Sequence, residues 1–129
     1  MGFPRAIIAA FRVALVVTVI VICFLAFTDR SFPALEHFSD KLRHAAAFVT
    51  LALLVDFSFP ASRFGTAKIL LLLGYGVGIE AVQYFLPHRE ASAWDVLADG
   101  LGIAAYMLSV PALKRMPWFR LRWQAGAAP

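Results

Sequence analysis

Four long hydrophobic runs, separated by short polar or proline-containing segments, dominate the pattern along this chain. Each run has about 20 residues, the length that an α-helix needs to cross the hydrocarbon core of a bilayer. We expect membrane spans over about residues 6–27, 41–59, 66–86 and 93–113. The pattern therefore predicts an all-α protein, an integral membrane four-helix bundle formed by a single domain over residues 1–129.

The first run could also be a signal peptide, because Arg5 and Arg12 supply a basic flank. It is long for that role, however, and no small-residue cleavage site follows it closely. We therefore expect an uncleaved first span. Pro33 should prevent its helix from continuing into the polar loop over residues 28–40.

Local signals predict where the later helices begin. Ser39 or Asp40 is a plausible N-cap for the second helix, since both side chains can accept from free backbone N–H groups. Ser92, followed three residues later by Asp95, resembles a capping box at the start of the fourth helix. Together these signals support the boundaries that the hydrophobic runs give.

Glycines in the third run indicate a close helix–helix contact. Gly74 and Gly78 form a G-x-x-x-G spacing, and small residues let helix backbones approach closely in lipid. Gly76 lies one turn before Glu80 on the same face of the predicted helix. We therefore expect Glu80 to point toward a neighbouring helix.

Composition supports a membrane protein. Hydrophobic residues make up 61% of the chain and charged residues only 16%, whereas soluble domains are about half apolar and a quarter charged. The formal net charge of +4 does not indicate a nucleic-acid partner, because the basic residues gather in loops beside the apolar runs. The single cysteine, Cys23, allows no internal disulfide.

Loop charges predict the orientation. Four spans place both chain ends and the loop after the second run on one side, and the positive-inside rule makes this side cytoplasmic. The tail over residues 114–129 is basic and aromatic, which is typical of a segment on an anionic membrane surface. Eight of the twelve Lys and Arg residues belong to this side: Arg5, Arg12, Arg63, Lys68, Lys114, Arg115, Arg120 and Arg122.

Ionisable residues gather near the outer ends of the last three predicted helices. Such a group costs roughly 2.5 to 3.5 kcal/mol at the centre of a membrane helix, so several of them together need compensation. A buried Glu80 would need a partner, which Lys41 or Arg89 could supply. We predict one outward-facing polar pocket, a ligand-binding site formed by Asp40, Lys41, His44, Glu80, Gln83, Arg89, Asp95 and Asp99.

Structural roles could explain the same residues. Asp95 could cap the fourth helix, Lys41 could snorkel to the interface, and His44 could be a neutral packing residue. Asp99 lies one turn deeper, where capping does not explain it. The alternative for the whole set is a network of ion pairs and hydrogen bonds that holds four helices together. Asp56, near the far end of the second run, can reach lipid headgroups or Lys68 and is assigned no function.

Four segments resemble the VanZ-like family of small bacterial membrane proteins: D-K-L-R-H from Asp40, G-I-E-A-V-Q from Gly78, P-H-R from Pro87 and D-V-L-A-D-G-L-G from Asp95. The resemblance covers about residues 40–106, and the family's motif positions match the eight predicted pocket residues. The family is named for a protein associated with teicoplanin resistance. The resemblance therefore implies a place in the bacterial cytoplasmic membrane and a role in the cell envelope.

This chain departs from the family pattern at two places. The position of Asp99 is commonly Asn in the family. The last helix of family members often continues with another glycine, where this chain has Ala105 and Tyr106.

Two main classes of function remain open. A binding protein would hold the headgroup of an envelope lipid or cell-wall precursor, with Lys41 and Arg89 at its phosphate, a role like that in glycopeptide resistance. An intramembrane enzyme would act on a lipid-linked substrate, with His44 as acid or base and Glu80 beside Asp95 or Asp99 on a divalent metal. A third possibility is a structural subunit of a membrane complex.

No motif assigns catalytic residues. The sequence contains no recognisable activated nucleophile, phosphate-cradling loop or His-rich metal spacing. We therefore predict no cofactor and no metal. The expected partners are a membrane lipid or lipid-linked precursor, and either another membrane protein or a second copy of the chain; no nucleic acid is expected.

Overall fold

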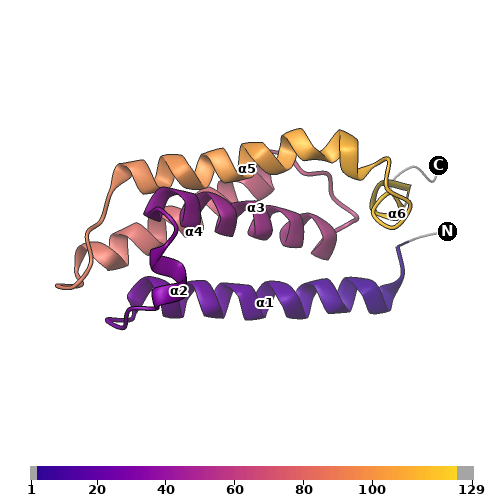
Figure 1. The fold of residues 1–129 in the computed structure, drawn as a ribbon. Helices are drawn as coiled ribbons and strands as arrows, with labels where there is room; N and C mark the ends of the chain where they lie inside the picture. Colours follow the sequence, from indigo (N-terminus) through magenta and orange to yellow (C-terminus); the bar gives the residue numbers. More distant parts are fainter. Residues whose placement is uncertain (1–2, 125–129) are drawn as a thin grey trace.

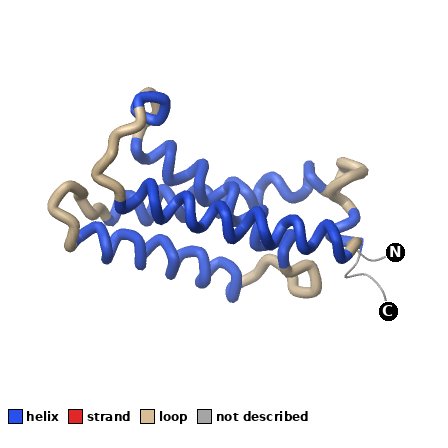
Figure 2. Tube along the Cα trace, turned by 90° about the horizontal axis from the view of Figure 1, so that it is seen from below, coloured by secondary structure: helices blue, strands red, loops and turns tan. Residues whose placement is uncertain are grey.

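The computed structural model describes residues 3–124, which form six helices and no strand. Four long helices lie side by side, and their bounds agree with the predicted spans to within two residues (Figures 1 and 2). They are α1 (Arg5–Phe27), α3 (Asp40–Ser58), α4 (Thr66–Tyr84) and α5 (Ala93–Leu113). Two short helices are α2 (Pro33–Glu36) and α6 (Leu121–Gln124). Residues 125–129 of the predicted basic tail lie outside the described part.

Pro33 breaks the helix as predicted but also starts a new one. It occupies the first turn of α2, where the missing N–H of proline has no cost. Ser39 caps α3, because its side chain accepts a hydrogen bond from the backbone N–H of Leu42 at 3.1 Å. The loop over residues 28–40 therefore contains one helical turn that the sequence analysis did not predict.

Three of the long helices are long and apolar enough to cross a membrane, namely α1, α4 and α5. Helix α3, also predicted to be a span, is not apolar enough to be counted with them. It carries Asp40, Lys41, Arg43 and His44 near its start and Asp56 near its end. Yet α3 packs against all three of the others. The most polar of the four long helices is therefore the one that its neighbours surround.

The hydrophobic core forms where α3 meets α4 and α5. The outer faces of α1, α4 and α5 carry exposed aliphatic side chains, as expected for helices that face lipid. α1 has no buried residue. The core residues are Phe48, Leu51, Ala52 and Val55 of α3, Leu72 of α4, and Ile103 and Tyr106 of α5.

Two glycines let the helices approach closely, but they are not the predicted pair. A Cβ atom at Gly102 would collide with the backbone carbonyl of Ala45, so α5 lies directly against the backbone of α3. A Cβ atom at Gly76 would collide with the carboxylate of Asp99. Gly74 and Gly78 have open space around them, so the predicted G-x-x-x-G contact is wrong for this fold.

A buried ionic cluster closes the end of the bundle where α1 begins and α6 lies (Figure 1). Asp56 is 0% exposed. Its Oδ2 accepts from the hydroxyl of Tyr106 at 2.6 Å, and its Oδ1 lies 3.0 Å from Lys68 Nζ and 2.6 Å from Arg122 Nη2. Asp56 reaches Lys68 as the sequence suggested, and two further partners complete its environment.

Arg122 joins α6 to the rest of the bundle through side-chain hydrogen bonds. Besides Asp56, it donates to the backbone carbonyls of Pro60 at 3.0 Å and Ser62 at 2.8 Å. The prediction that the basic tail lies on the membrane surface is therefore wrong for Arg122, which is buried. Three other basic residues of the tail are exposed: Lys114, Arg115 and Arg120.

Replacing Arg122 by alanine tests this cluster. Because Asp56 would keep its charge in a buried place and lose a partner, we expect Arg122→Ala to lower the free energy of unfolding by about 3 kcal/mol. Arg120→Ala, an exposed arginine two residues away, is the control and should change it by less than about 0.5 kcal/mol. Denaturation in mixed micelles measures both. Equal effects of the two substitutions would contradict the cluster.

The close approach of α3 and α5 predicts a difference between two glycines. Gly102→Ala forces a methyl group against the Ala45 carbonyl and should cost roughly 1 to 3 kcal/mol of stability. Gly78→Ala has room for the methyl group and should be neutral or slightly stabilising. The same unfolding measurement compares them, and a tolerated Gly102→Ala would be incompatible with the observed packing.

Candidate functional site

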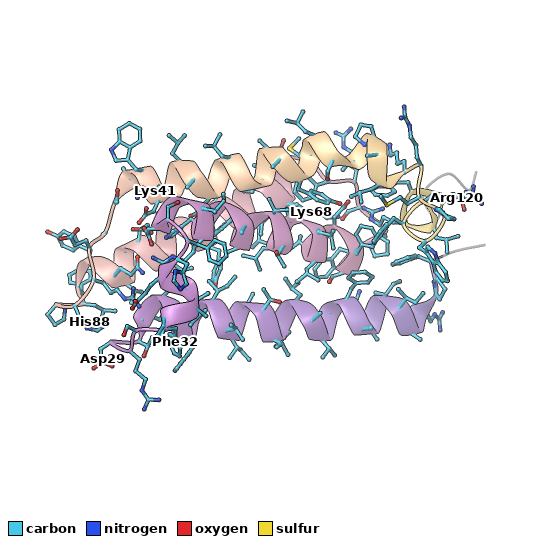
Figure 3. The ribbon with its side chains drawn as sticks, in the orientation of Figure 1. Asp29, Phe32, Lys41, Lys68, His88 and Arg120 are labelled. Carbon is cyan, nitrogen blue, oxygen red and sulfur yellow. The ribbon has the colours of Figure 1, made fainter. Side chains whose placement is uncertain are left out.

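Most of the predicted site residues lie at the end of the bundle opposite to the Asp56 cluster. Figure 3 shows Lys41 and His88 at this end together with Asp29 and Phe32, whereas Lys68 and Arg120 lie at the other end. The end of α1, the start of α3, the end of α4 and the start of α5 come together here (Figure 1). Sequence segments from all four long helices therefore contribute to one polar region.

His44 and Asp99 form the centre of an acidic cluster between α3 and α5. His44 Nδ1 lies 2.8 Å from Asp99 Oδ1, and the Asp99 side chain is 1% exposed. His44 Nε2 is 3.7 Å from Asp95 Oδ2 and 4.0 Å from Asp40 Oδ2. Asp99 therefore serves as the partner of His44, which explains why it lies one turn deeper than a helix cap.

Lys41 pairs with Asp95 across the same helix contact. Its ammonium touches Asp95 Oδ1 and lies 3.7 Å from Asp40 Oδ2. Arg43 Nη2 lies 3.2 Å from Asp40 Oδ1, so both Lys41 and Arg43 form ion pairs with Asp40. The Asp95 side chain is buried while that of Lys41 is 49% exposed, so the lysine reaches in from the surface to the carboxylate.

Glu80 is buried, as predicted, but its partner is different. Its Oε2 accepts from the backbone N–H of Ser92 at 2.9 Å, and among the described residues it forms no ion pair with Lys41 or Arg89. The Ser92 hydroxyl in turn accepts from the backbone N–H of Trp94 at 3.2 Å. Glu80 thus takes the carboxylate role that the capping box had assigned to Asp95. Glu80 also lies close enough to the acidic cluster to interact with it electrostatically.

Arg89 and Gln83 complete the end of α1 instead of joining the acidic cluster. The last carbonyl groups of a helix have no partner within it, and here residues 25–28 receive theirs from the α4–α5 region. Arg89 Nη2 donates to two of these carbonyls at 2.7 and 2.8 Å, and Gln83 Nε2 donates to a third at 2.9 Å. His88 Nε2 lies 3.0 Å from the fourth. The segment P-H-R therefore locks α1 to the rest of the bundle.

A cavity of about 300 Å³ opens beside this junction, between the α1–α2 segment, the start of α3 and the α4–α5 loop. Three arginines, Arg30, Arg43 and Arg89, line it together with His88. Of the eight residues predicted to form one pocket, Arg89 lines this cavity and the other seven do not. We call it the arginine cavity.

The predicted site residues therefore divide into two groups. Six belong to the acidic cluster or lie beside it, and two, Gln83 and Arg89, hold the end of α1. Arg30, Arg43 and His88 were not predicted to line a site, although one signal was present. Each is a basic residue on the side that the loop charges predict to face outward, where the positive-inside rule does not favour basic residues. The acidic cluster contains Asp40, Lys41, His44, Asp95 and Asp99, with Glu80 beside it.

Comparison with known proteins identifies the family of this chain. The apolar helices and the charged residues packed between them are features of a membrane protein. The VanZ/LLP1 family model matches residues 4–114, and the chain belongs to this family. The resemblance seen in the sequence is thereby confirmed and extends to the first helix. No curated protein and no solved structure matches the chain.

Two substitutions at Asp99 test its pairing with His44. Asp99→Asn keeps an oxygen that can accept from Nδ1, so we expect little loss of stability, less than about 1 kcal/mol. Asp99→Ala leaves the imidazole N–H without its acceptor and should cost about 1 to 3 kcal/mol. Unfolding of the two variants, with the ¹⁵N shifts of His44 as a local probe, measures the difference. Equal stability and unchanged His44 shifts in both variants would contradict the pairing.

Proposed function

We propose that this chain is a multi-pass protein of the bacterial cytoplasmic membrane that binds the anionic headgroup of an envelope lipid or cell-wall precursor. In this proposal α1, α3, α4 and α5 form a four-helix membrane bundle with both termini in the cytoplasm. The arginine cavity then opens toward the outer leaflet. A role in resistance to glycopeptides such as teicoplanin, which the resemblance noted in the sequence implies, is part of this proposal.

Exposed aromatic residues at both ends support the membrane placement. Tyr84, Phe85 and Trp94 are well exposed at the end of α4 and the start of α5, and Trp118 is exposed at the opposite end of the bundle. Trp and Tyr are enriched at the two interfaces of a bilayer, where one edge of the ring remains hydrated. The two groups of aromatic side chains lie at opposite ends of the bundle. Most of the basic residues lie at the Trp118 end, which supports a cytoplasmic location for it.

The arginine cavity is the observation that carries the headgroup proposal. Its volume of about 300 Å³ lies at the lower limit for small-ligand sites. Three guanidinium groups and one imidazole line it, opposed by two carboxylates, Asp29 and Glu36. Three guanidinium groups exceed two carboxylates in the lining, although Arg43 also pairs with Asp40 of the acidic cluster. A guanidinium group matches the geometry of phosphate oxygens, so the lining favours an anion.

Arg89 is held in place before any ligand binds. Its Nη2 is fixed by two carbonyls at the end of α1, while its Nε is buried without a hydrogen-bond partner among the described residues. A donor that is already oriented loses little conformational entropy when an anion arrives. Arg30 and Arg43 complete the cation set from the other two walls.

Apolar side chains make the cavity more suitable for a lipid than for a free ion. Leu25, Phe32 and Leu35 lie in its wall beside the polar groups. A lipid would place its phosphate among the arginines and its first methylene groups along these side chains. Lys41, which the sequence analysis placed at the phosphate, contacts Asp95 instead and has no part in this proposal.

An intramembrane enzyme is the second candidate, favoured by the His44–Asp99 pair. A carboxylate at Nδ1 orients the ring so that Nε2 is the nitrogen available for proton transfer. His44 is partly exposed, and Nε2 faces the side of Asp40 and Asp95. A screen for turnover of phospholipids and polyprenyl phosphates by the wild type and by His44→Ala tests this candidate.

Lipid retention tests the binding proposal. The Arg30→Gln, Arg43→Gln double variant removes two cations from the cavity without disturbing the carbonyl contacts of Arg89. We expect roughly a tenfold loss of co-purifying phosphate-containing lipid, equivalent to about 1.4 kcal/mol. Mass spectrometry of lipid extracted from the purified full-length chain measures the loss. The control is the Arg63→Gln, Arg115→Gln double variant, which makes the same charge change at the opposite end.

Addition of inorganic phosphate distinguishes a free anion from a lipid headgroup. Retained lipid should resist millimolar phosphate, because the apolar wall contributes to lipid binding but not to binding of a free ion. Equal lipid content in the wild type and both double variants would overturn the proposal.

A further inference from the structure

The acidic cluster contains a group of metal-ligand atoms that the headgroup proposal does not use. One ligand atom each from Asp40, His44 and Asp95 lies within 4.8 Å of the other two. The distances from His44 Nε2 to the two carboxylate oxygens are 3.7 and 4.0 Å. Ligand atoms at about 2.0 to 2.2 Å from a zinc ion lie roughly 3 to 4 Å apart, so a small contraction would bring all three to one ion.

Asp99 orients the histidine for such a role. It binds His44 Nδ1 at 2.8 Å from a buried position, which leaves Nε2 facing the two carboxylates. Histidine ligands of metal ions usually donate their other ring nitrogen to a carboxylate or carbonyl, which fixes the ring and raises its basicity. The arrangement of Asp99 and His44 therefore matches the supporting shell of a metal site.

The charge of the cluster also favours a bound cation. Four carboxylates surround or border His44, opposed by the side chains of Lys41 and Arg43. With His44 neutral, two formal negative charges remain. Two buried carboxylate oxygens at the border of the cluster, Glu80 Oε1 and Asp99 Oδ2, have no hydrogen-bond partner within residues 3–124; Asp99 Oδ2 faces Gly76 of α4, so it adds to the negative charge of the cluster and is not itself a ligand atom. Uncompensated negative charge at the end of an apolar bundle is costly, and a divalent cation would offset most of it, even when Lys41 turns away.

We propose that Asp40, His44 and Asp95 bind a divalent transition-metal ion at the outer end of α3 and α5. Imidazole and carboxylate ligands together suit Zn²⁺ or Mn²⁺ better than Ca²⁺. The ion lies between Nε2 of His44 and the Oδ2 atoms of the two aspartates, and Asp99 is a positioning residue. The site goes beyond the headgroup proposal and does not depend on the arginine cavity.

Lys41 stands in for the ion when no metal is bound. Its ammonium contacts Asp95 Oδ1 and lies 3.7 Å from Asp40 Oδ2, which places a positive charge beside both carboxylates. Because the lysine side chain is half exposed, it can turn outward when the metal enters. Lys41 therefore competes with the metal, and its removal should strengthen metal binding.

Calorimetric titration with Zn²⁺ tests the site in the purified full-length chain after treatment with a chelator. We expect one zinc ion per chain, and at least roughly tenfold weaker binding in His44→Ala, Asp95→Asn and Asp99→Ala. The exposed Asp40→Asn variant, which is least able to disturb the core, should also bind more weakly. His37→Ala removes an exposed histidine that is not part of the acidic cluster, so this control variant should bind zinc like the wild type.

Lys41→Met separates a metal site from a purely structural ion-pair cluster. A metal site predicts several-fold tighter zinc binding in this variant, since the competing ammonium is gone. Circular dichroism confirms helix content before each titration, so that loss of folding is not mistaken for loss of a ligand. Absence of saturable binding to the folded wild type, or wild-type affinity in both His44→Ala and Asp40→Asn, would overturn the proposal.

Discussion

The close approach of α3 and α5 is the constraint on which the other features depend. With no side chain at Gly102, the α5 backbone lies against the carbonyl of Ala45 in α3. Toward the start of both helices, this register places His44 beside Asp99. Toward their other ends, it places Asp56 beside Tyr106. Charged groups buried in an apolar bundle are costly without partners, and this register supplies partners for His44 and Asp56.

The end of the bundle where α3 and α5 begin contains two neighbouring regions of opposite charge. The arginine cavity collects guanidinium groups from loops and from α3, whereas the acidic cluster lies between α3 and α5. Arg43 joins them, because it lines the cavity and pairs with Asp40 at 3.2 Å. On the proposed functions, an anion in the cavity and a cation in the cluster would both act on Arg43, so occupancy of one site should affect the other.

The sequence predicted the long helices well because each is an apolar run of about 20 residues bounded by polar or proline-containing segments, a pattern that can be recognised in each run separately. It also identified Asp99 as more than a helix cap. Pairing across helices was harder, because it depends on how each helix is rotated and on which backbone groups lie nearby. Sequence spacing suggested an ion pair between Glu80 and Lys41 or Arg89, but Glu80 accepts from the N–H of Ser92 and Arg89 donates to carbonyls of α1. Arg122, expected on the membrane surface, lies inside the bundle beside Asp56.

The central claim is that α3 and α5 meet in a register that joins His44 to Asp99. Solid-state NMR in lipid bilayers measures this directly, through the dipolar coupling between the ¹⁵Nδ1 of His44 and the ¹³C of the Asp99 carboxylate. The account predicts a strong coupling that corresponds to a direct hydrogen bond, because the nitrogen lies 2.8 Å from Oδ1. No detectable coupling in the folded protein would contradict the account and would separate the two helices at this level.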